Sequence, residues 1–268
     1  MKHIFKFTSI LLAGSILFTS CKKDDTIVAD QISQETLSQI AAHGFGTGNV
    51  QKVDEGYIVE GDIVLTPEFL SQAPAGNLLR IANNEQYRTK NLVTGLPRTI
   101  TISLDSKLKA KAGYTQALAE VALRYNDLNN TLKMSVVASG GEISFVNGNG
   151  NFLASAGFPT STGNPYGTVK VNAQSIGTGT TPTFINFLAT ILAHEAGHCI
   201  GFRHTDYMDR SYSCGGSTAN EGASTVGAIH IPGTPTVADA GSWMLACISR
   251  NQNRPFNNND RTALNYLY

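Results

Sequence analysis

Hydrophobic and polar residues alternate most regularly in the middle of the chain. Residues 99–104 place an apolar side chain at every second position, which is typical of a strand with one buried face. Apolar residues at helical spacing predict an amphipathic helix over 114–132, and residues 182–199 form a second, largely apolar helix. Glycine-rich and asparagine-rich turns separate three further predicted strands, at residues 134–138, 142–146 and 168–172.

The pattern is weaker before residue 99. Residues 57–65 are rich in strand-forming side chains, are interrupted by Gly61-Asp62, and are followed by Thr66-Pro67, a typical cap and first turn of a helix. Residues 26–48 are polar or glycine-rich, as in a tether. Residues 80–98 carry several basic side chains with little apolar periodicity, so a domain boundary is predicted near residue 95.

Composition excludes one class of partner. The 268 residues have a formal net charge of zero, and only 15% of them are charged. Such a chain has no broad basic face for a phosphate backbone, so we expect no nucleic-acid partner. The length suits one domain of roughly 150 to 200 residues with a leader and a further segment. The sequence does not determine the oligomeric state, and we expect a monomer.

The N-terminus predicts export. Met1-Lys2-His3 and Lys6 give a basic start, and a short apolar run follows at residues 10–18, as in a secretory signal. The run ends in Leu17-Phe18-Thr19-Ser20-Cys21, which resembles a bacterial lipobox with Cys21 as the acylated residue. An ordinary signal peptide that ends near a chance cysteine is the alternative. The lipobox implies a lipid anchor in a bacterial membrane, on the outer membrane or cell surface, from which processing would release the protein.

The helix predicted over 182–199 carries the candidate chemistry. His194 and His198 lie four positions apart, so both imidazoles share one face of the helix and can hold one metal ion. Glu195, between them, is placed to act as general base toward the attacking water. Three histidine nitrogens that leave a fourth position open are typical of a catalytic zinc ion, and His204 supplies the third. Gly201 is expected to end the helix so that His204 can turn back to the metal.

The full motif is His-Glu-x-x-His-x-x-Gly-x-x-His, and at this length it resembles the metzincins, a class of zinc peptidases. Ser242-Trp243-Met244 resembles their methionine turn, which implies that Met244 supports the metal site from below. The likeness covers residues 99–268. It implies an α+β fold: a twisted mixed β-sheet with a backing helix, an active-site helix, the methionine turn and a C-terminal helix.

Within the metzincins, the sequence from His194 to Asp206 is most similar to the bacterial dual-action HEIGH metallopeptidases, of the Bacteroidetes lipoprotein type. Thr205 follows the third histidine and Ala246 follows the methionine turn, and both depart from the astacin pattern. Glu60-Gly61-Asp62 nevertheless resembles the astacin prosegment motif, in which an aspartate reaches the zinc. The resemblance implies that Asp62 is a latency switch; a simple turn aspartate is the alternative.

These resemblances divide the chain into three parts. Residues 1–20 are the lipoprotein signal peptide, residues 21–95 the tether and candidate prosegment, and residues 96–268 the zinc peptidase domain. Once Cys21 is set aside, three cysteines remain, which suggests one disulfide and one free thiol. Cys214 with Cys247 is favoured because Cys199 lies in the active-site helix, but the sequence alone does not fix the pairing.

The leading functional hypothesis is an exported metalloendopeptidase that has one catalytic zinc ion and acts on peptides or proteins. An extended substrate would pair with an edge strand, for which residues 168–172 are the candidate. A surface lipoprotein that binds zinc without turnover is the first alternative, and intact Glu195 argues against it. A zinc hydrolase that acts on other bonds is the second.

Overall fold

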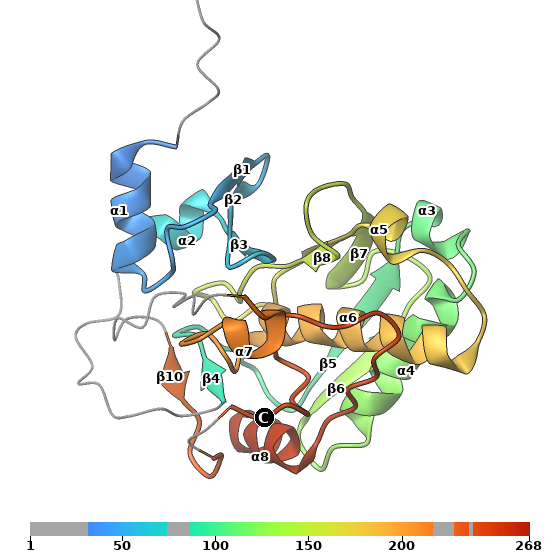
Figure 1. Ribbon diagram of the computed structural model, residues 1–268. Coiled ribbons are helices and arrows are strands. Elements are labelled where there is room, and N and C mark those ends of the chain that lie inside the picture. Colours follow the sequence, from blue (N-terminus) through green and yellow to red (C-terminus); the bar gives the residue numbers. More distant parts are fainter. Residues whose placement is uncertain (1–31, 74–85, 217–227, 236–237) are drawn as a thin grey trace, which may run out of the picture. The chain divides into compact units, whose positions relative to one another are not determined.

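A computed structural model describes residues 32–73, 86–216, 228–235 and 238–268. A five-stranded mixed sheet is the largest of the sheets in these residues (Figure 1). The strands lie in the order β6-β5-β7-β9-β8, and β8 runs antiparallel to its neighbour β9. In β5, Ile100 and Ile102 are fully buried, as their alternation with threonine predicts. The strand bounds are β5 (Arg98–Leu104), β6 (Leu132–Val136), β7 (Ile143–Asn147), β8 (Ala154–Ser155) and β9 (Thr168–Val171).

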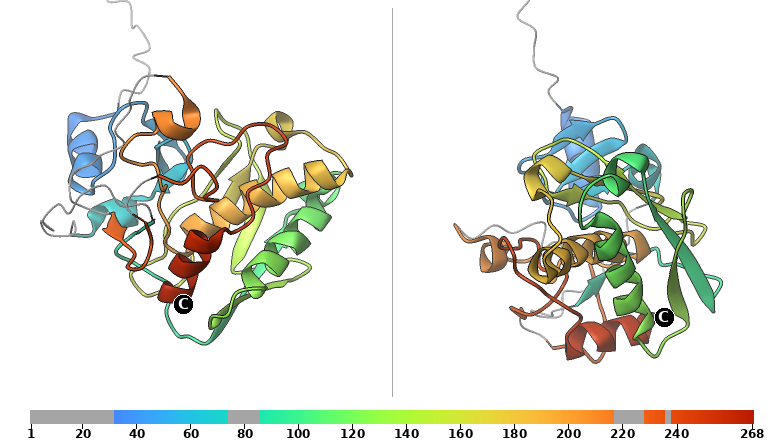
Figure 2. Two further views of the ribbon diagram at one scale, coloured as in Figure 1. Left: turned by 60° about the horizontal axis from the view of Figure 1, so that its bottom comes forward. Right: turned by 90° about the vertical axis from the view of Figure 1, so that its right-hand side faces the viewer.

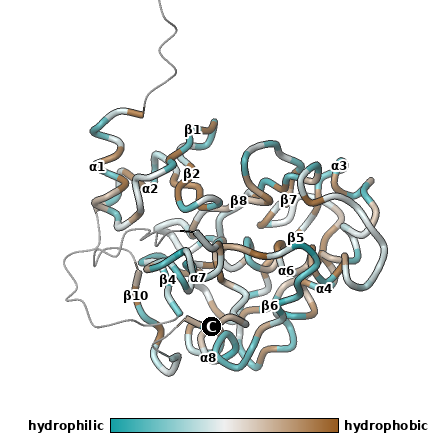
Figure 3. The backbone as a smooth tube through the Cα atoms, viewed as in Figure 1, coloured by the Kyte–Doolittle hydropathy of each residue, from teal (hydrophilic) through white to brown (hydrophobic). Residues whose placement is uncertain are grey.

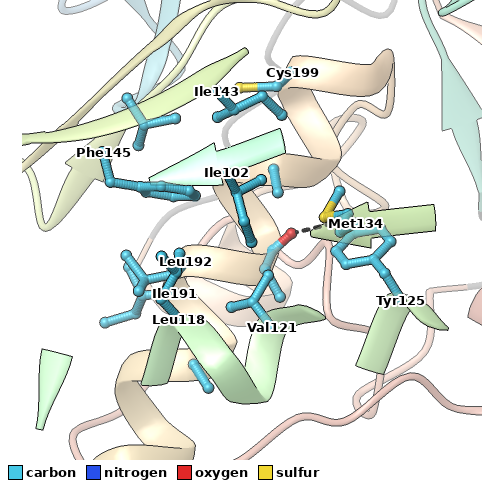
Figure 4. Packing of buried hydrophobic residues seen from close by; sticks show 14 of the residues in the cluster. Ile102, Leu118, Val121, Tyr125, Met134, Ile143, Phe145, Ile191, Leu192 and Cys199 are labelled. Carbon is cyan, nitrogen blue, oxygen red and sulfur yellow. Dashed lines mark hydrogen bonds between the residues drawn. The ribbon is translucent and has the colours of Figure 1, made fainter. Parts of the chain in front are cut away.

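Two long helices, α4 (Tyr114–Asn126) and α6 (Pro182–Ile200), share the main hydrophobic core with this sheet (Figure 2). Figure 4 shows how tightly they meet: the Tyr125 hydroxyl of α4 donates to the backbone oxygen of Ala193 in α6, at 2.9 Å. Hydrophobic stretches of backbone follow α6 and the strands beside it, whereas the outer loops are more hydrophilic (Figure 3). The α+β fold with its backing helix and active-site helix is therefore confirmed.

Helix α4 is shorter than predicted, because the side chain of its last residue, Asn126, forms hydrogen bonds with strand β6. Asn126 Nδ2 donates to the Met134 oxygen, and Asn126 Oδ1 accepts from the Met134 nitrogen, both at 2.8 Å. This amide clamp joins the end of α4 to β6. Leu132, predicted as the end of the helix, is instead the first residue of that strand.

The C-terminal helix α8 (Asn258–Leu267) begins with a capping box formed by Asn257 and Asp260. Asp260 is fully buried and does more than cap the helix. It also accepts hydrogen bonds from Gln86 Nε2 at 2.6 Å, Ser242 Oγ at 2.9 Å and the Trp243 nitrogen at 3.2 Å. One carboxylate thus connects the last helix, the predicted methionine turn and the start of the peptidase domain.

Residues 32–73, here called the N-terminal segment, pack around a second small core that includes Ile40, Phe45 and Leu65. No helix is predicted at residues 34–42, because the helix there is short and buries only Ile40. Its N-cap is Ser33, whose hydroxyl accepts from the Thr36 nitrogen at 3.1 Å. The elements of this segment are α1 (Gln34–Ala42), β1 (Gln51–Val53), β2 (Gly56–Val59), β3 (Ile63–Leu65) and α2 (Pro67–Ser71).

Residues 86–93 lie ahead of the predicted boundary at 96, yet they pack against the peptidase domain. Gln86 is fully buried, and the Thr89 nitrogen donates to the Gly201 oxygen at 2.8 Å. In the described part of the chain, no helix combines the length and hydrophobicity needed to span a bilayer. The remaining short elements are β4 (Tyr87–Arg88), α3 (Ser106–Lys109), α5 (Ala173–Ile176), α7 (Ser211–Cys214) and β10 (Ile229–His230).

Candidate metal centre

Helix α6 places two of the predicted ligands side by side. His194 is 7% exposed, His198 is fully buried, and their Nε2 atoms lie 3.0 Å apart. The opposite nitrogen of each ring meets a backbone oxygen: His194 Nδ1 donates to Trp243 at 2.9 Å, and His198 Nδ1 donates to Phe202 at 2.8 Å. These bonds fix the orientation of both rings and leave an acceptor lone pair on each Nε2. The two lone pairs face each other, an arrangement that a shared cation stabilises.

The helix then ends as predicted. Ile200 is its last residue, and Gly201 follows with φ 114°, a left-handed conformation that suits glycine. An added Cβ at Gly201 would lie 2.9 Å from the Asn91 oxygen, so the site has no room for a side chain either. The chain turns back at once and buries His204 completely.

The three imidazoles fit a zinc ion. One nitrogen from each ring and a carboxylate oxygen of Asp62 all lie within 4.8 Å of one another. Burial, together with the imidazoles of His194 and His204, lowers the pKa of His198 well below its usual value, which favours the neutral ring that binds metal. Three neutral histidines with an oxygen ligand are a typical zinc donor set.

Met244 lies in a turn that packs against α6, the helix that carries His194 and His198. Its side chain is fully buried, and the Thr205 nitrogen donates to its backbone oxygen at 3.0 Å. A Cβ added to Gly197 would lie 2.6 Å from Met244 Sδ. Glycine at position 197 thus lets the turn approach the helix, a requirement that the sequence alone did not reveal.

Glu195 lies next to the first ligand, on the wall of a pocket that also contains His194 and Asp62. It is 2% exposed, and its Oε2 has no hydrogen-bond partner among the described residues. Burial, reinforced by the charge of Asp62, raises the pKa of Glu195 well above its usual value. A buried carboxylate of high proton affinity beside a metal site is suited to accept and return protons.

Asp62 reaches the histidine cluster from the N-terminal segment. Its Oδ1 lies 3.2 Å from His204 Nε2, and its Oδ2 lies 3.5 Å from His194 Nε2. Burial alone would raise the pKa of Asp62, but the imidazoles of His204 and His194 outweigh it and hold the pKa well below its usual range. Glu60 and Gly61, with φ 54° and 93°, form the tight turn that directs Asp62 at the cluster.

A buried ion pair fastens this turn. Glu60 Oε1 accepts from Arg203 Nη2 at 2.6 Å, and both side chains are at most 1% exposed. The Arg203 guanidinium also lies 4.2 Å from the centre of the Phe45 ring. The residue spacing did not reveal this pair. Its one signal in the sequence was Arg203 itself, in a motif whose other variable positions are small or apolar.

The backbone of the N-terminal segment continues along the edge of the sheet. The Val64 nitrogen donates to the Ala156 oxygen at 2.7 Å, and the Ala156 nitrogen donates to the Asp62 oxygen at 3.0 Å. The candidate edge for peptide binding, residues 168–172, is wrong, because β9 lies between β7 and β8. The edge strand on this side of the sheet is β8, which is too short to predict, and Asp62 to Val64 pair with Ala156 directly after it.

The remaining predicted residues fall in three places. Cys214 and Cys247 form a disulfide that links the loop after His204 to the chain after Met244. Cys199 is a buried free thiol. Cys21 lies outside the described residues.

Together, the mixed sheet, the helix with its two histidines, the third histidine after the glycine turn and the methionine turn packed against that helix define a zinc metallopeptidase. Comparison with protein families agrees: residues 57–268 match the dual-action HEIGH metallo-peptidases. Because the match covers well over half of the chain, the protein belongs to this family. The resemblance drawn from the histidine motif is thereby confirmed. Among curated proteins, none matches the sequence.

Solved structures with similar folds share little sequence with this chain. A crystal structure of myroilysin is 16% identical over 43% of this chain, with a TM-score of 0.31, and the alignment spans only 48% of that chain. A second myroilysin structure is 14% identical over 66% of this chain and 96% of its own, with a TM-score of 0.40. High choriolytic enzyme 1, a hatching-enzyme zinc protease from the medaka Oryzias latipes, is 14% identical over 63% and 88% of the two chains, with a TM-score of 0.35.

Proposed function

We propose that the protein is a latent zinc endopeptidase, exported as a lipoprotein and held inactive by its own N-terminal segment. The observation that carries the proposal is the meeting of three histidine nitrogens with Asp62, beside the buried Glu195. The leader and Cys21 support export and lipid attachment. The peptide-bond substrate is supported by the family and by the sheet edge at β8 and Ala156, where a segment of this chain already pairs through its backbone.

His194, His198 and His204 would hold the metal. When bound, zinc polarises the carbonyl of the scissile bond and makes water more acidic. Glu195 Oε2 accepts the proton of the attacking water and returns it to the nitrogen of the leaving group. The hydrogen bonds of His194 to Trp243 and of His198 to Phe202 keep both rings oriented throughout.

Latency follows from the position of Asp62. Its carboxylate faces the histidine cluster, where the attacking water would have to enter, and the segment that carries it occupies the edge of β8. Removal of the N-terminal segment would expose both the histidine cluster and this sheet edge. Cleavage after Gln86 would remove a residue that is buried in the peptidase domain. The activating cleavage should therefore precede Gln86, which excludes most of the basic stretch from Arg80 to Arg98.

The first test compares hydrolysis of a quenched generic protein substrate by the chain from residue 22 and by a shortened chain that begins at Glu85. Each is paired with Glu195→Gln, and zinc content is measured on every sample. We expect chelator-sensitive cleavage by the shortened chain, weaker cleavage by the longer one, and loss of about three or more orders of magnitude in the Glu195 variant, since general base catalysis contributes on that scale.

Two results would count against the proposal. Bound zinc without cleavage in either chain would indicate the zinc-binding lipoprotein instead. Equal activity of the two chains would leave the peptidase standing but refute latency. Asp62→Ala in the longer chain separates the carboxylate from the rest of the segment, because it keeps the backbone pairing with β8.

A further inference from the structure

The pocket beside Glu195 contains a charge that the proposed mechanism does not use. Its volume is about 210 Å³, enough for one substrate side chain, and Ile191 and Leu245 contribute apolar walls. Arg254 also lines the pocket, on the chain that follows the methionine turn. A group in this pocket would lie close to the bond being cut, because His194 and Glu195 also line the pocket.

Arg254 is buried with most of its hydrogen-bonding capacity unused. The residue is 8% exposed. Its Nη1 donates to the Cys247 oxygen at 2.7 Å, while its Nε is buried without an acceptor among the described residues. Guanidinium groups that are buried for structural reasons normally have their N–H groups paired. Arg254 lines the pocket and uses only one of its five N–H groups within the described chain, so an acceptor on a bound substrate has donors to meet.

No carboxylate of the described chain takes that role. Asp206 and Asp260 are the acidic groups near enough to act on Arg254, and both are engaged elsewhere: Asp206 accepts from the Ala246 nitrogen at 2.9 Å and from Ser213 Oγ at 2.5 Å. Burial lowers the pKa of Arg254, and these two carboxylates offset part of that effect. Arginine is so basic that the group remains charged at neutral pH.

A second arginine, Arg210, also lines the pocket. The Arg210 guanidinium lies against the disulfide, with Nε 3.2 Å from Cys214 Sγ, and against the N-terminal segment, where an added Cβ at Gly61 would meet Nη2 at 2.5 Å. Gly61 and Asp62 form part of the pocket lining. Departure of the N-terminal segment would therefore open the pocket on the side of Arg210.

We propose that Arg254 makes this pocket a carboxylate subsite, so that the enzyme selects bonds flanked by a substrate carboxylate. The carboxylate belongs either to an aspartate or glutamate side chain or to the free C-terminus of a peptide. The apolar walls suit the methylene groups of a glutamate, and the guanidinium suits its planar carboxylate. This inference rests on the proposed function, because it names the substrate class of that same site.

Binding tests the subsite without turnover. The probes are peptide hydroxamates that differ only in carrying glutamate or glutamine next to the hydroxamate, with the C-terminus amidated or free. They are titrated calorimetrically into the zinc-loaded full chain that carries Glu60→Gln and Asp62→Ala. We expect the glutamate probe, or the probe with a free C-terminus, to bind about tenfold more tightly than its neutral partner, as for one charge-assisted hydrogen bond.

Variants locate the preference. Arg254→Gln should abolish it, and Arg254→Lys should restore part of it. Arg250→Gln is the matched control, because Arg250 lies on the same segment but donates outside the pocket, to the backbone oxygens of Ile176 and Ser175. Equal binding of acidic and neutral probes would overturn the inference, as would a preference that survives in Arg254→Gln.

The inference and the proposed function can fail separately. Cleavage of a peptide library with no acidic residue or terminal carboxylate enriched beside the cut would refute the subsite and leave the peptidase intact. Selective binding of the acidic probe with no cleavage would support the subsite and refute turnover. Amidation of the C-terminus distinguishes the two sources of carboxylate.

Discussion

At the scale of single residues, the metal centre depends on a glycine whose role the sequence concealed. Gly197→Ala would raise helix propensity by about 1 kcal/mol, but the new methyl group would lie 2.6 Å from Met244 Sδ and 3.2 Å from the Trp243 ring. Both side chains are at most 1% exposed, so they have little room to move. We expect a net loss of stability of about 1 kcal/mol, since overpacking costs about 1–3 kcal/mol.

The same substitution should weaken zinc binding by about tenfold, because a displaced Trp243 no longer holds His194 through its backbone oxygen. Competition with a fluorescent zinc chelator and thermal unfolding measure the two effects. Gly48→Ala is the control, as its new methyl group meets no atom within 4 Å. Unchanged zinc affinity in Gly197→Ala would show that the turn does not orient the ligand.

Residue spacing predicted the ligands but not the groups that orient them. His194, His198 and Gly201 follow local rules of helix geometry and termination, which a sequence displays directly. Their partners depend on contacts between distant parts of the chain. Tertiary packing brings the Trp243 oxygen to His194 and the Asp260 carboxylate to the methionine turn. The periodicity of the sequence does not predict either contact.

At the scale of elements, the disulfide stabilises one wall of the pocket. It closes a loop with a sequence separation of 33, and it lies against Arg210. Loop-closure entropy for such a loop corresponds to about 3–4 kcal/mol. The double variant Cys214→Ser/Cys247→Ser should therefore lose about 3–4 kcal/mol of unfolding free energy and unfold at a lower denaturant concentration. Chemical denaturation measures it, and dithiothreitol should reproduce the loss in the unmodified chain but not in the variant.

The Glu60–Arg203 pair should govern how firmly the N-terminal segment is docked. Glu60→Gln leaves Arg203 buried without its countercharge, which costs about 3–5 kcal/mol. The cost disappears when the segment departs and water reaches Arg203, so the substitution favours the undocked state. We expect faster amide hydrogen exchange in β3 and higher peptidase activity of the unprocessed chain.

The processed enzyme provides the control for the Glu60→Gln experiment. Glu60 lies ahead of the activation cleavage, so the processed enzymes from the unmodified and Glu60→Gln chains are identical and must have equal activity. A rise confined to the unprocessed chain would support the docking role. Unchanged exchange in β3 would show that the backbone pairing with β8 suffices without the ion pair.

Elements with strong periodicity were predictable, and those that depend on their neighbours were not. Helix α6 carries a cap, an apolar core and a glycine end, and its bounds agree with the prediction to within one residue. Strand β8 has two residues and helix α1 buries one. Both elements form because other parts of the chain pack beside them, and their own residues show little periodicity. For this reason the sequence pattern favours residues 168–172 as the sheet edge and a tether at residues 34–42.

At the scale of the whole molecule, the order of parts along the chain predicts that activation and release are one event. Cys21, the residue proposed to carry the lipid, and Asp62, proposed to block the site, both precede Gln86, which is buried against the turn before Met244 and helix α8. A single cleavage between Asp62 and Gln86 would remove the anchor and the block together. In cells that express the unmodified chain, we expect the unprocessed form in the membrane fraction and the active form in the soluble fraction.

Metabolic labelling with a fatty acid, fractionation and activity measurements over time test this coupling. Cys21→Ala should abolish labelling and move the unprocessed chain out of the membrane fraction, yet leave it latent, because Asp62 remains in place. Activity that appears while the enzyme is still membrane-bound would separate the two events and place the anchor elsewhere. An unprocessed Cys21→Ala chain with full activity would instead show that the lipid, not Asp62, restrains the enzyme.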